Sequence, residues 1–265
     1  MKRVYTMIIG GIFAVHAYAQ TNGDENKIPK QSSPANLANY RMTINSTNNR
    51  ISEISVCKII QRSQQSYSDN AFQLADVHRT EISEQGQNTR KLEDLEGLNI
   101  KILDDNFTKL DFYKDVPPAH VEYVRMLVQD KFSFDIWGQM YLDSLRLNVP
   151  FYPDLFQNQQ ADFEQSVNFN TQKLNITWFG YSKINGKDCI LLYYKSMYSP
   201  FLVDNDYMTV SGRSCFWGNI WILLNTRQIE YATMNEDVVS TMKLKGNDTE
   251  QQRNWQREVI YEKIE

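Results

Sequence analysis

The sequence predicts an α+β fold in which helices pack on one face of an antiparallel sheet. A β-hairpin is the first reason: Asn185-Gly186 separates two runs rich in β-branched and aromatic residues, 174–184 and 187–198. Asn-Gly favours a type I′ turn because both residues tolerate positive φ. The second reason is that apolar residues occupy both faces of the second run, so other parts of the protein or a ligand must cover both faces of the sheet. The third reason is a helical spacing of apolar residues over 118–147.

Residues 1–19 have the three parts of a secretory signal. Two basic residues precede an apolar run over 7–15, and 17–19 is a small-x-small cleavage sequence. The apolar run is much shorter than the roughly 20 residues that a membrane-spanning helix needs. We therefore expect cleavage before Gln20, a periplasmic or secreted protein, and no integral membrane span.

The remaining chain divides into a leader and one domain. Residues 20–38 are polar, contain two prolines and lack any period, which is typical of a flexible leader. Residues 39–265 form the predicted single α+β domain. Signal removal leaves 28 − 2 = 26 Lys and Arg against 32 Asp and Glu, a net charge of −6. This acidic balance, without a basic cluster, argues against a nucleic-acid partner.

In the first half of the domain, strands come before helices. Alternating apolar residues predict strands over 40–44 and 51–60, and the polar run 61–73 predicts a loop. Between 82 and 102 the pattern does not decide between strand and helix. Two prolines at 117–118 suit a helix start. Apolar spacing then predicts one helix to about Lys131 and a second from about Asp135 to Leu147.

In the second half, the hairpin continues as an antiparallel meander. Residues 218–224 and 228–234 are expected to be strands joined by the turn Asn225-Thr226-Arg227, and 258–264 is expected to close the sheet.

Few residues point to catalysis. After signal removal only His78 and His120 remain, and the chain contains no zinc, nucleophile-elbow or phosphate-loop signature. We therefore expect no metal and no cofactor, and the sequence favours a binding protein over an enzyme. Carboxylate pairs such as Glu236-Asp237, or Asp204 with Asp206, leave a glycan hydrolase open.

The three cysteines also leave alternatives open. Cys189 and Cys215 both fall in the meander, so a bridge between strands is one possibility in an exported chain. Buried free thiols are the other, because cysteine is among the most often buried residue types. If the bridge formed, Cys57 would be left as the odd thiol.

Two segments of the meander carry a family resemblance. The residues Gly186, Cys189 and Leu192 match a GxxCxxL strand, and a G-x-I-W-I hairpin follows with Gly218, Trp221, Thr226 and Ile229. Over about 70 residues this order resembles outer-membrane lipoprotein carrier-like half-barrels. The resemblance implies a curved, half-barrel-like antiparallel sheet around an apolar cavity that holds lipid or lipoprotein acyl chains. The composition and the short signal also resemble uncharacterised exported proteins of Bacteroidota.

The resulting functional hypothesis is an exported soluble carrier or binding protein that holds a lipid or acyl chain against a curved sheet. Its expected ligand-binding residues are aromatic or apolar side chains of the meander: Trp178, Leu192, Tyr194, Trp217 and Trp221. Burial in the core is the competing role for these residues. A glycan-binding module or glycan-directed hydrolase, and a cell-envelope interaction protein, remain alternative functions.

Overall fold

The computed structural model describes residues 27–28, 38–50, 56–68, 71–83, 86–101, 110–153, 160–163, 167–170, 173–247 and 249–264. The predicted signal at 1–19 and all of the predicted leader except Lys27, Ile28 and Ala38 lie outside these ranges. Ile28 is buried and joins the hydrophobic core.

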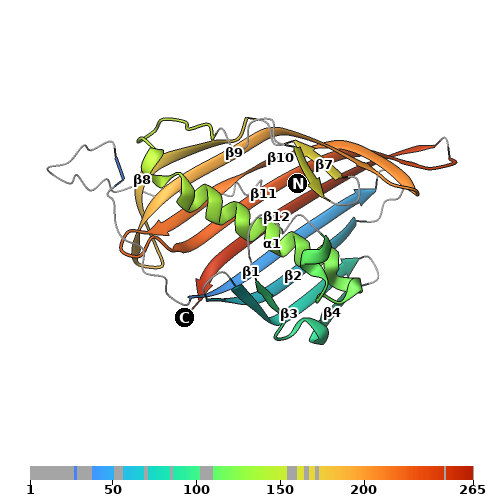
Figure 1. The fold of residues 1–265 in the computed structure, drawn as a ribbon, viewed down its shortest axis with the longest axis horizontal. Coiled ribbons are helices and arrows are strands. Elements are labelled where there is room, and N and C mark those ends of the chain that lie inside the picture. The colour runs from blue at the N-terminus through green and yellow to red at the C-terminus, as the bar shows by residue number, and fades with distance from the viewer. Residues whose placement is uncertain are drawn as a thin grey trace, which may run out of the picture.

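The described residues form one antiparallel sheet of twelve strands, drawn in Figure 1. Its strands are β1 (Ala38–Arg50), β2 (Val56–Ser68), β3 (Ala71–Ser83), β4 (Gly86–Lys91), β5 (Asn99–Lys101), β6 (Gln160–Phe163), β7 (Val167–Asn170), β8 (Asn175–Ile184), β9 (Lys187–Asp204), β10 (Met208–Leu223), β11 (Ile229–Leu244) and β12 (Glu250–Ile264). Every strand pair within it is antiparallel.

The sheet is open, and its strand order brings the two ends of the domain together. The order is β4-β3-β2-β1-β12-β11-β10-β9-β7-β6, with β5 beside β3 and β8 beside β9. The first strand therefore lies between β2 and the last strand, with Asn39 opposite Ile264. β9 pairs with β10 on one side and with β8 and then β7 on the other.

One α-helix, α1 (Val121–Asp135), occurs among the described residues, and it runs obliquely across the strands in Figure 1. It continues directly into a π-helical turn (Ile136–Met140) and then a short 3₁₀ turn (Leu142–Ser144). Three further 3₁₀ turns lie at Glu93–Leu95, Leu110–Tyr113 and Pro118–His120. The broad α+β class is confirmed.

The predicted hairpin is confirmed, turn included. Asn185 and Gly186 have φ values of 51° and 76°, the left-handed pair that a type I′ turn requires. β8 and β9 leave this turn in register, with Ile184 opposite Lys187.

Two predictions about the first half were wrong. The polar run 61–73 is not a loop, because β2 continues to Ser68 and β3 begins at Ala71. Residues 61–68 are held in β2 by backbone pairing with β1 and β3, which needs no apolar pattern. The second predicted helix is also absent, because the π-helical turn carries the same helix past Asp135.

The core lies between α1 and the sheet face beneath it. Phe134 stacks on Tyr261 with ring centroids 5.7 Å apart, and Trp137 stacks on Phe216 at 5.3 Å. The ring centroids of Tyr194 and Trp137 are 4.4 Å apart on the same face. Aromatic pairs at these separations contribute beyond the area they bury, so they fix α1 on the sheet.

The structure contains free thiols at two of the three cysteines. Cys189 is buried and Cys215 is half-buried, and the two are not bridged. The bridge considered for them is wrong because Cys189 pairs with Leu223 at one end of β10, whereas Cys215 lies well along the same strand opposite Asp237. The side chain of Cys57 lies outside the described residues.

Candidate functional site

The residues expected to bind a ligand fall on two different faces of the sheet. Trp178, Leu192 and Tyr194 are at most 1 % exposed and belong to the core beneath α1. Trp217 and Trp221 are half-buried and point away from that core, because they alternate along β10 with the buried Ile220. The structure thus brings the first three together and separates them from the last two. A ligand-binding role for these five residues stays a prediction.

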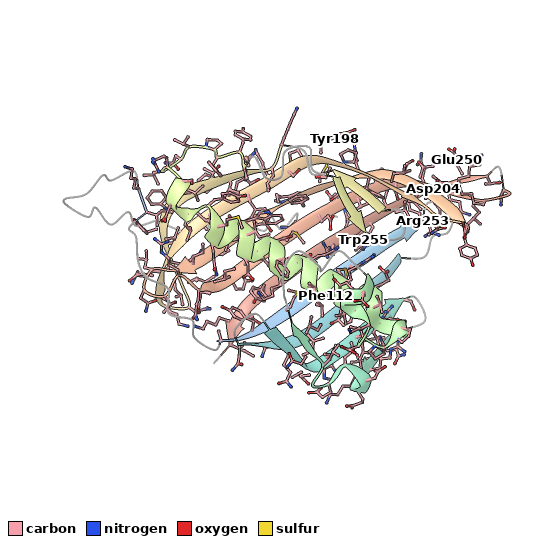
Figure 2. The ribbon with its side chains drawn as sticks, in the orientation of Figure 1. Phe112, Tyr198, Asp204, Glu250, Arg253 and Trp255 are labelled. Atoms are coloured by element: carbon pink, nitrogen blue, oxygen red, sulfur yellow. The ribbon has the colours of Figure 1, made fainter. Side chains whose placement is uncertain are left out.

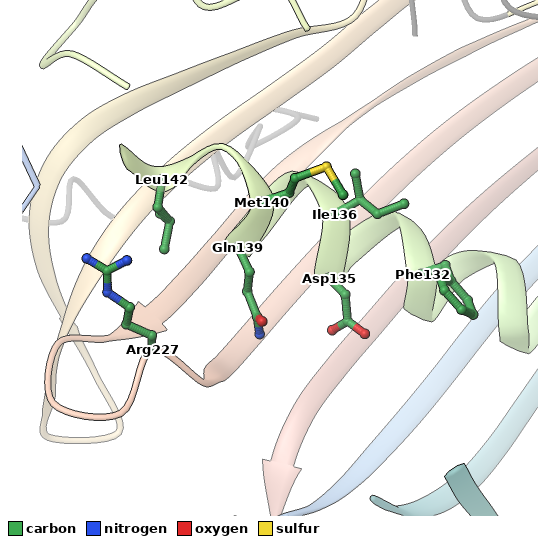
Figure 3. A pocket seen from close by; sticks show the side chains of 7 residues that line it. All are labelled: Phe132, Asp135, Ile136, Gln139, Met140, Leu142 and Arg227. Carbon is green, nitrogen blue, oxygen red and sulfur yellow. The ribbon is translucent and has the colours of Figure 1, made fainter. Parts of the chain in front are cut away.

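A groove that the sequence did not predict lies along the C-terminal end of α1. Its volume is about 450 Å³. The side chains that line it, all drawn in Figure 3, are Phe132, Asp135, Ile136, Gln139, Met140, Leu142 and Arg227.

The π-helical turn supplies three of these lining residues: Ile136, Gln139 and Met140. Such turns are rare inside helices and occur frequently at functional sites. Gly138 brings the turn close to the sheet, since a Cβ there would lie 3.3 Å from Cγ2 of Ile220. The irregular apolar spacing after Phe132 was the signal in the sequence that marked this turn.

One end of the groove carries a cation that the fold holds in place. Arg227 adopts a left-handed φ of 56° in the turn between β10 and β11, and its backbone N–H donates to Leu223 O at 2.9 Å. Its Nη1 and Nη2 lie 3.3 and 3.4 Å from a single oxygen, Oδ1 of Asp143. Asp135, farther along the groove, forms an ion pair with Lys131.

A buried ionic cluster lies under α1, separate from the groove lining. Arg257 of β12 donates from Nη1 to Asp130 Oδ2 of α1 at 2.8 Å, and from Nε to Glu236 Oε2 of β11 at 2.9 Å. The hydroxyl of Ser214 donates to the other Glu236 oxygen at 2.5 Å. The guanidinium also lies 5.3 Å from the ring of Trp255, labelled in Figure 2. This cluster ties the helix to three neighbouring strands.

The charges in the cluster are largely removed from water. The side chains of Asp130, Arg257 and Glu236 are 5 %, 9 % and 11 % exposed. Burial raises the pKa of Asp130 to about 6, and the attraction of Arg257 only partly opposes this effect. Asp130 therefore takes up a proton at a higher pH in the folded protein than in the unfolded chain.

This shift predicts a pH dependence that Asp130→Asn should remove. The neutral acid is favoured in the folded state, so its contribution to stability is fully present below pH 3.8 and is lost as the pH rises through about 6. The free energy of unfolding of the wild type, relative to that of Asp130→Asn, should rise by roughly 2–3 kcal/mol between pH 7 and pH 4. Urea denaturation of both proteins over this range measures the difference, and a flat difference would contradict the assignment.

The two histidines that follow the predicted signal lie apart and do not share a site. His78 contacts Asp76 at 2.9 Å and His120 contacts Asp94 at 2.9 Å, on separate elements. Within the ranges that the structure describes, no group of three or more His, Cys, Asp or Glu residues is arranged to hold a metal ion. In the same ranges, no helix combines the length and hydrophobicity needed to cross a membrane.

The carboxylate pairs considered from the sequence are also placed. Glu236 belongs to the buried cluster, whereas its neighbour Asp237 points to the opposite face because strand side chains alternate. Asp204 pairs with Lys245 at 2.7 Å, at the exposed end of the hairpin between β9 and β10.

Comparison with known proteins does not assign a family. No protein-family model matches the chain, and no curated protein does. A crystal structure of a DUF1329 family protein from Desulfovibrio piger is 10% identical in sequence and covers 82% of this chain and 83% of its own, with a TM-score of 0.13. A TM-score this low does not establish a shared fold.

Proposed function

We propose that this protein is an exported binding or carrier protein that holds an apolar chain in the groove beside α1. The groove carries the proposal: its volume of about 450 Å³ falls in the range of ligand pockets, roughly 300–1,000 Å³. Four of its seven lining residues are apolar: Phe132, Ile136, Met140 and Leu142. A few polar groups among apolar walls are typical of sites that bind small molecules.

Side chains already fill the space between α1 and the sheet, so a ligand would bind in the groove beside the helix. Trp178 and Leu192 are buried opposite one another on β8 and β9, and the buried Tyr194 packs against Trp137 with ring centroids 4.4 Å apart. Interiors packed in this way leave few voids larger than a water molecule. In the proposal, the sheet is an open support rather than the half-barrel that the carrier resemblance implies. The ligand chain is bound along α1 rather than between α1 and the sheet. A periplasmic or secreted location belongs to the same proposal.

Binding of a fluorescent fatty acid tests this function, with Met140→Glu as the decisive variant. Met140 lines the groove and is 59 % exposed, so a charge there should leave the melting temperature unchanged. It should weaken probe binding roughly tenfold or more, because the chain would have to desolvate a carboxylate.

Met197→Glu is the matched control. Met197 is 58 % exposed and lies on β9, outside the groove lining. This variant should bind the probe like the wild type. A delipidated wild type that binds no probe, or equal affinity in all three proteins, would reject the function.

The opposite face of the sheet supports a second candidate, a glycan-binding module. Phe179 is 47 % exposed and stacks on Tyr193 with centroids 5.6 Å apart, and Trp221 meets Tyr231 edge to face at 5.5 Å. Exposed aromatic rings can stack on the apolar faces of sugars. A glycan array probed with the wild type and with Phe179→Ala tests this: silence of the wild type removes the candidate.

A further inference from the structure

We propose, on the basis of the function above, that the natural ligand class is a single-chain amphiphile with a carboxylate or similar anionic head, which binds Arg227 in place of Asp143. The apolar chain then lies along Phe132, Ile136 and Met140. Three observations carry the proposal: the position of Arg227, the geometry of its ion pair, and the pairing of the remaining charges in the groove.

Among the described residues that line the groove, Arg227 is the only cationic one. It comes from the turn between β10 and β11, whereas the other six lining residues come from α1 and the turns that follow it. Figure 3 shows its guanidinium near Leu142, at the end of the groove opposite Phe132. The site therefore has one polar, cationic end and an apolar length, which matches a molecule with one charged head and one chain.

The ion pair that now holds Arg227 is of the kind that a ligand can replace. Both Nη atoms approach the same oxygen of Asp143, at 3.3 and 3.4 Å, whereas charge-assisted bonds are usually about 2.7–2.9 Å long. The Asp143 side chain is 52 % exposed, so it can turn into water at little cost. A ligand carboxylate could accept the two N–H groups with its two oxygens, the fork-to-fork geometry that guanidinium favours.

The ion pair between Arg257 and Asp130 of α1 shows the contrast. Arg257 contacts Asp130 at 2.8 Å, and neither side chain is more than 9 % exposed. That pair is short and enclosed, and a ligand has no path to exchange with it. The side chain of Arg227 is nearly as enclosed, at 12 % exposed, but that of Asp143 is 52 % exposed, so the carboxylate is the part of this pair that can exchange.

The remaining charge in the groove does not favour a cationic ligand. Asp135 carries the only carboxylate among the described lining residues, and it already pairs with Lys131, whose side chain is 10 % exposed. A cationic head would have to displace this enclosed lysine. An anionic head would take the place of Asp143, whose side chain is exposed.

The backbone conformation of the turn at Arg227 does not depend on the arginine side chain. A left-handed φ of 56° on a residue other than glycine is uncommon and is often found where a ligand is clamped. The bond from its N–H to Leu223 O would survive replacement of the side chain. Arg227→Gln should therefore keep the turn and its melting temperature while removing the charge.

Calorimetric titration with three probes that share one alkyl chain tests the proposal: dodecanoate, dodecanol and dodecylamine, with delipidated full-length protein. For the wild type, dodecanoate should bind at least roughly tenfold more tightly than dodecanol, as expected for a hydrogen bond to a charged group. Arg227→Gln should bind the two with equal affinity. Asp143→Asn should tighten dodecanoate binding severalfold and leave dodecanol binding unchanged, because it removes the competing carboxylate.

The outcomes separate this inference from the function on which it rests. Equal binding of dodecanoate and dodecanol by the wild type, or preference for dodecylamine, would overturn the anionic head and leave the apolar chain site standing. Unchanged selectivity in Arg227→Gln would also overturn it. Failure of all three probes to bind would reject the proposed function, and the inference with it.

Discussion

Replacing Arg257 by Met should lower the free energy of unfolding by about 3–5 kcal/mol at pH 8. The substitution keeps an unbranched side chain of similar length but removes the cation between Asp130 and Glu236. Two buried carboxylates would then remain without their partner, and desolvating an unpaired charge costs far more than a buried ion pair contributes. Urea denaturation followed by circular dichroism measures the change.

Arg41→Met is the matched control. Arg41 forms an ion pair with Glu262 at 3.2 Å, and their side chains are 46 % and 33 % exposed. Its loss should cost less than about 1 kcal/mol, as for other surface pairs. Equal effects of the two substitutions would show that the Arg257 cluster does not hold α1 on the sheet.

The effects of substitutions in the cluster on the free energy of unfolding should not be additive. Replacing Asp130, Glu236 and Arg257 together by apolar residues of similar size should cost less than the Arg257 substitution alone, because no charge is then left buried. A triple variant less stable than Arg257→Met would contradict this account.

Gly218→Ala should destabilise the protein by about 3 kcal/mol or more, through overpacking at the middle of the sheet. A Cβ at this position would lie 1.8 Å from the Thr233 carbonyl oxygen and 2.7 Å from the Tyr194 hydroxyl. Tyr194 reaches across Gly218 and donates to that same carbonyl oxygen at 2.8 Å. The backbone of β10 or β11 would have to move, since a carbonyl group cannot rotate away as a side chain can. Thermal and urea denaturation measure the loss.

Gly138→Ala is the control for a crowded glycine. Its Cβ would lie 3.3 Å from a methyl group of Ile220, which can shift by a few tenths of an ångström. Its cost should therefore be much smaller than that of Gly218→Ala. Tyr194→Phe should cost only about 1 kcal/mol, the usual worth of one hydrogen bond, and should not rescue Gly218→Ala, because the clash with the Thr233 carbonyl remains.

Features of the fold that depend only on residues adjacent in the sequence were predictable. The Asn185-Gly186 turn needs only two residues that tolerate positive φ, and it formed where predicted. Strand lengths were not predictable: β11 extends ten residues beyond the predicted end at Met234, to Leu244. The residues beyond Met234 are mostly polar and are held in the strand by pairing with β10 and β12.

The candidate site was much harder to predict because its parts are distant in sequence. Arg227 reaches the groove from a turn 84 residues after its partner Asp143. Asp130 and Arg257 are 127 residues apart and meet only when α1 lies on β12. No local sequence pattern indicates which distant residues come into contact. A groove or a buried ionic cluster of this kind is therefore found only from the three-dimensional structure.

The position of β1 also has a consequence for the order of folding. Asn39 pairs with Ile264, a separation of 264 − 39 = 225 residues, so the central strand pair closes the largest loop in the domain. The loop-closure entropy must be lost before that pairing contributes, and such topologies fold slowly. A chain emerging from N to C terminus cannot complete this sheet until its last strand is available. Until then, one edge of β1 presents unpaired backbone groups to any other strand that it meets.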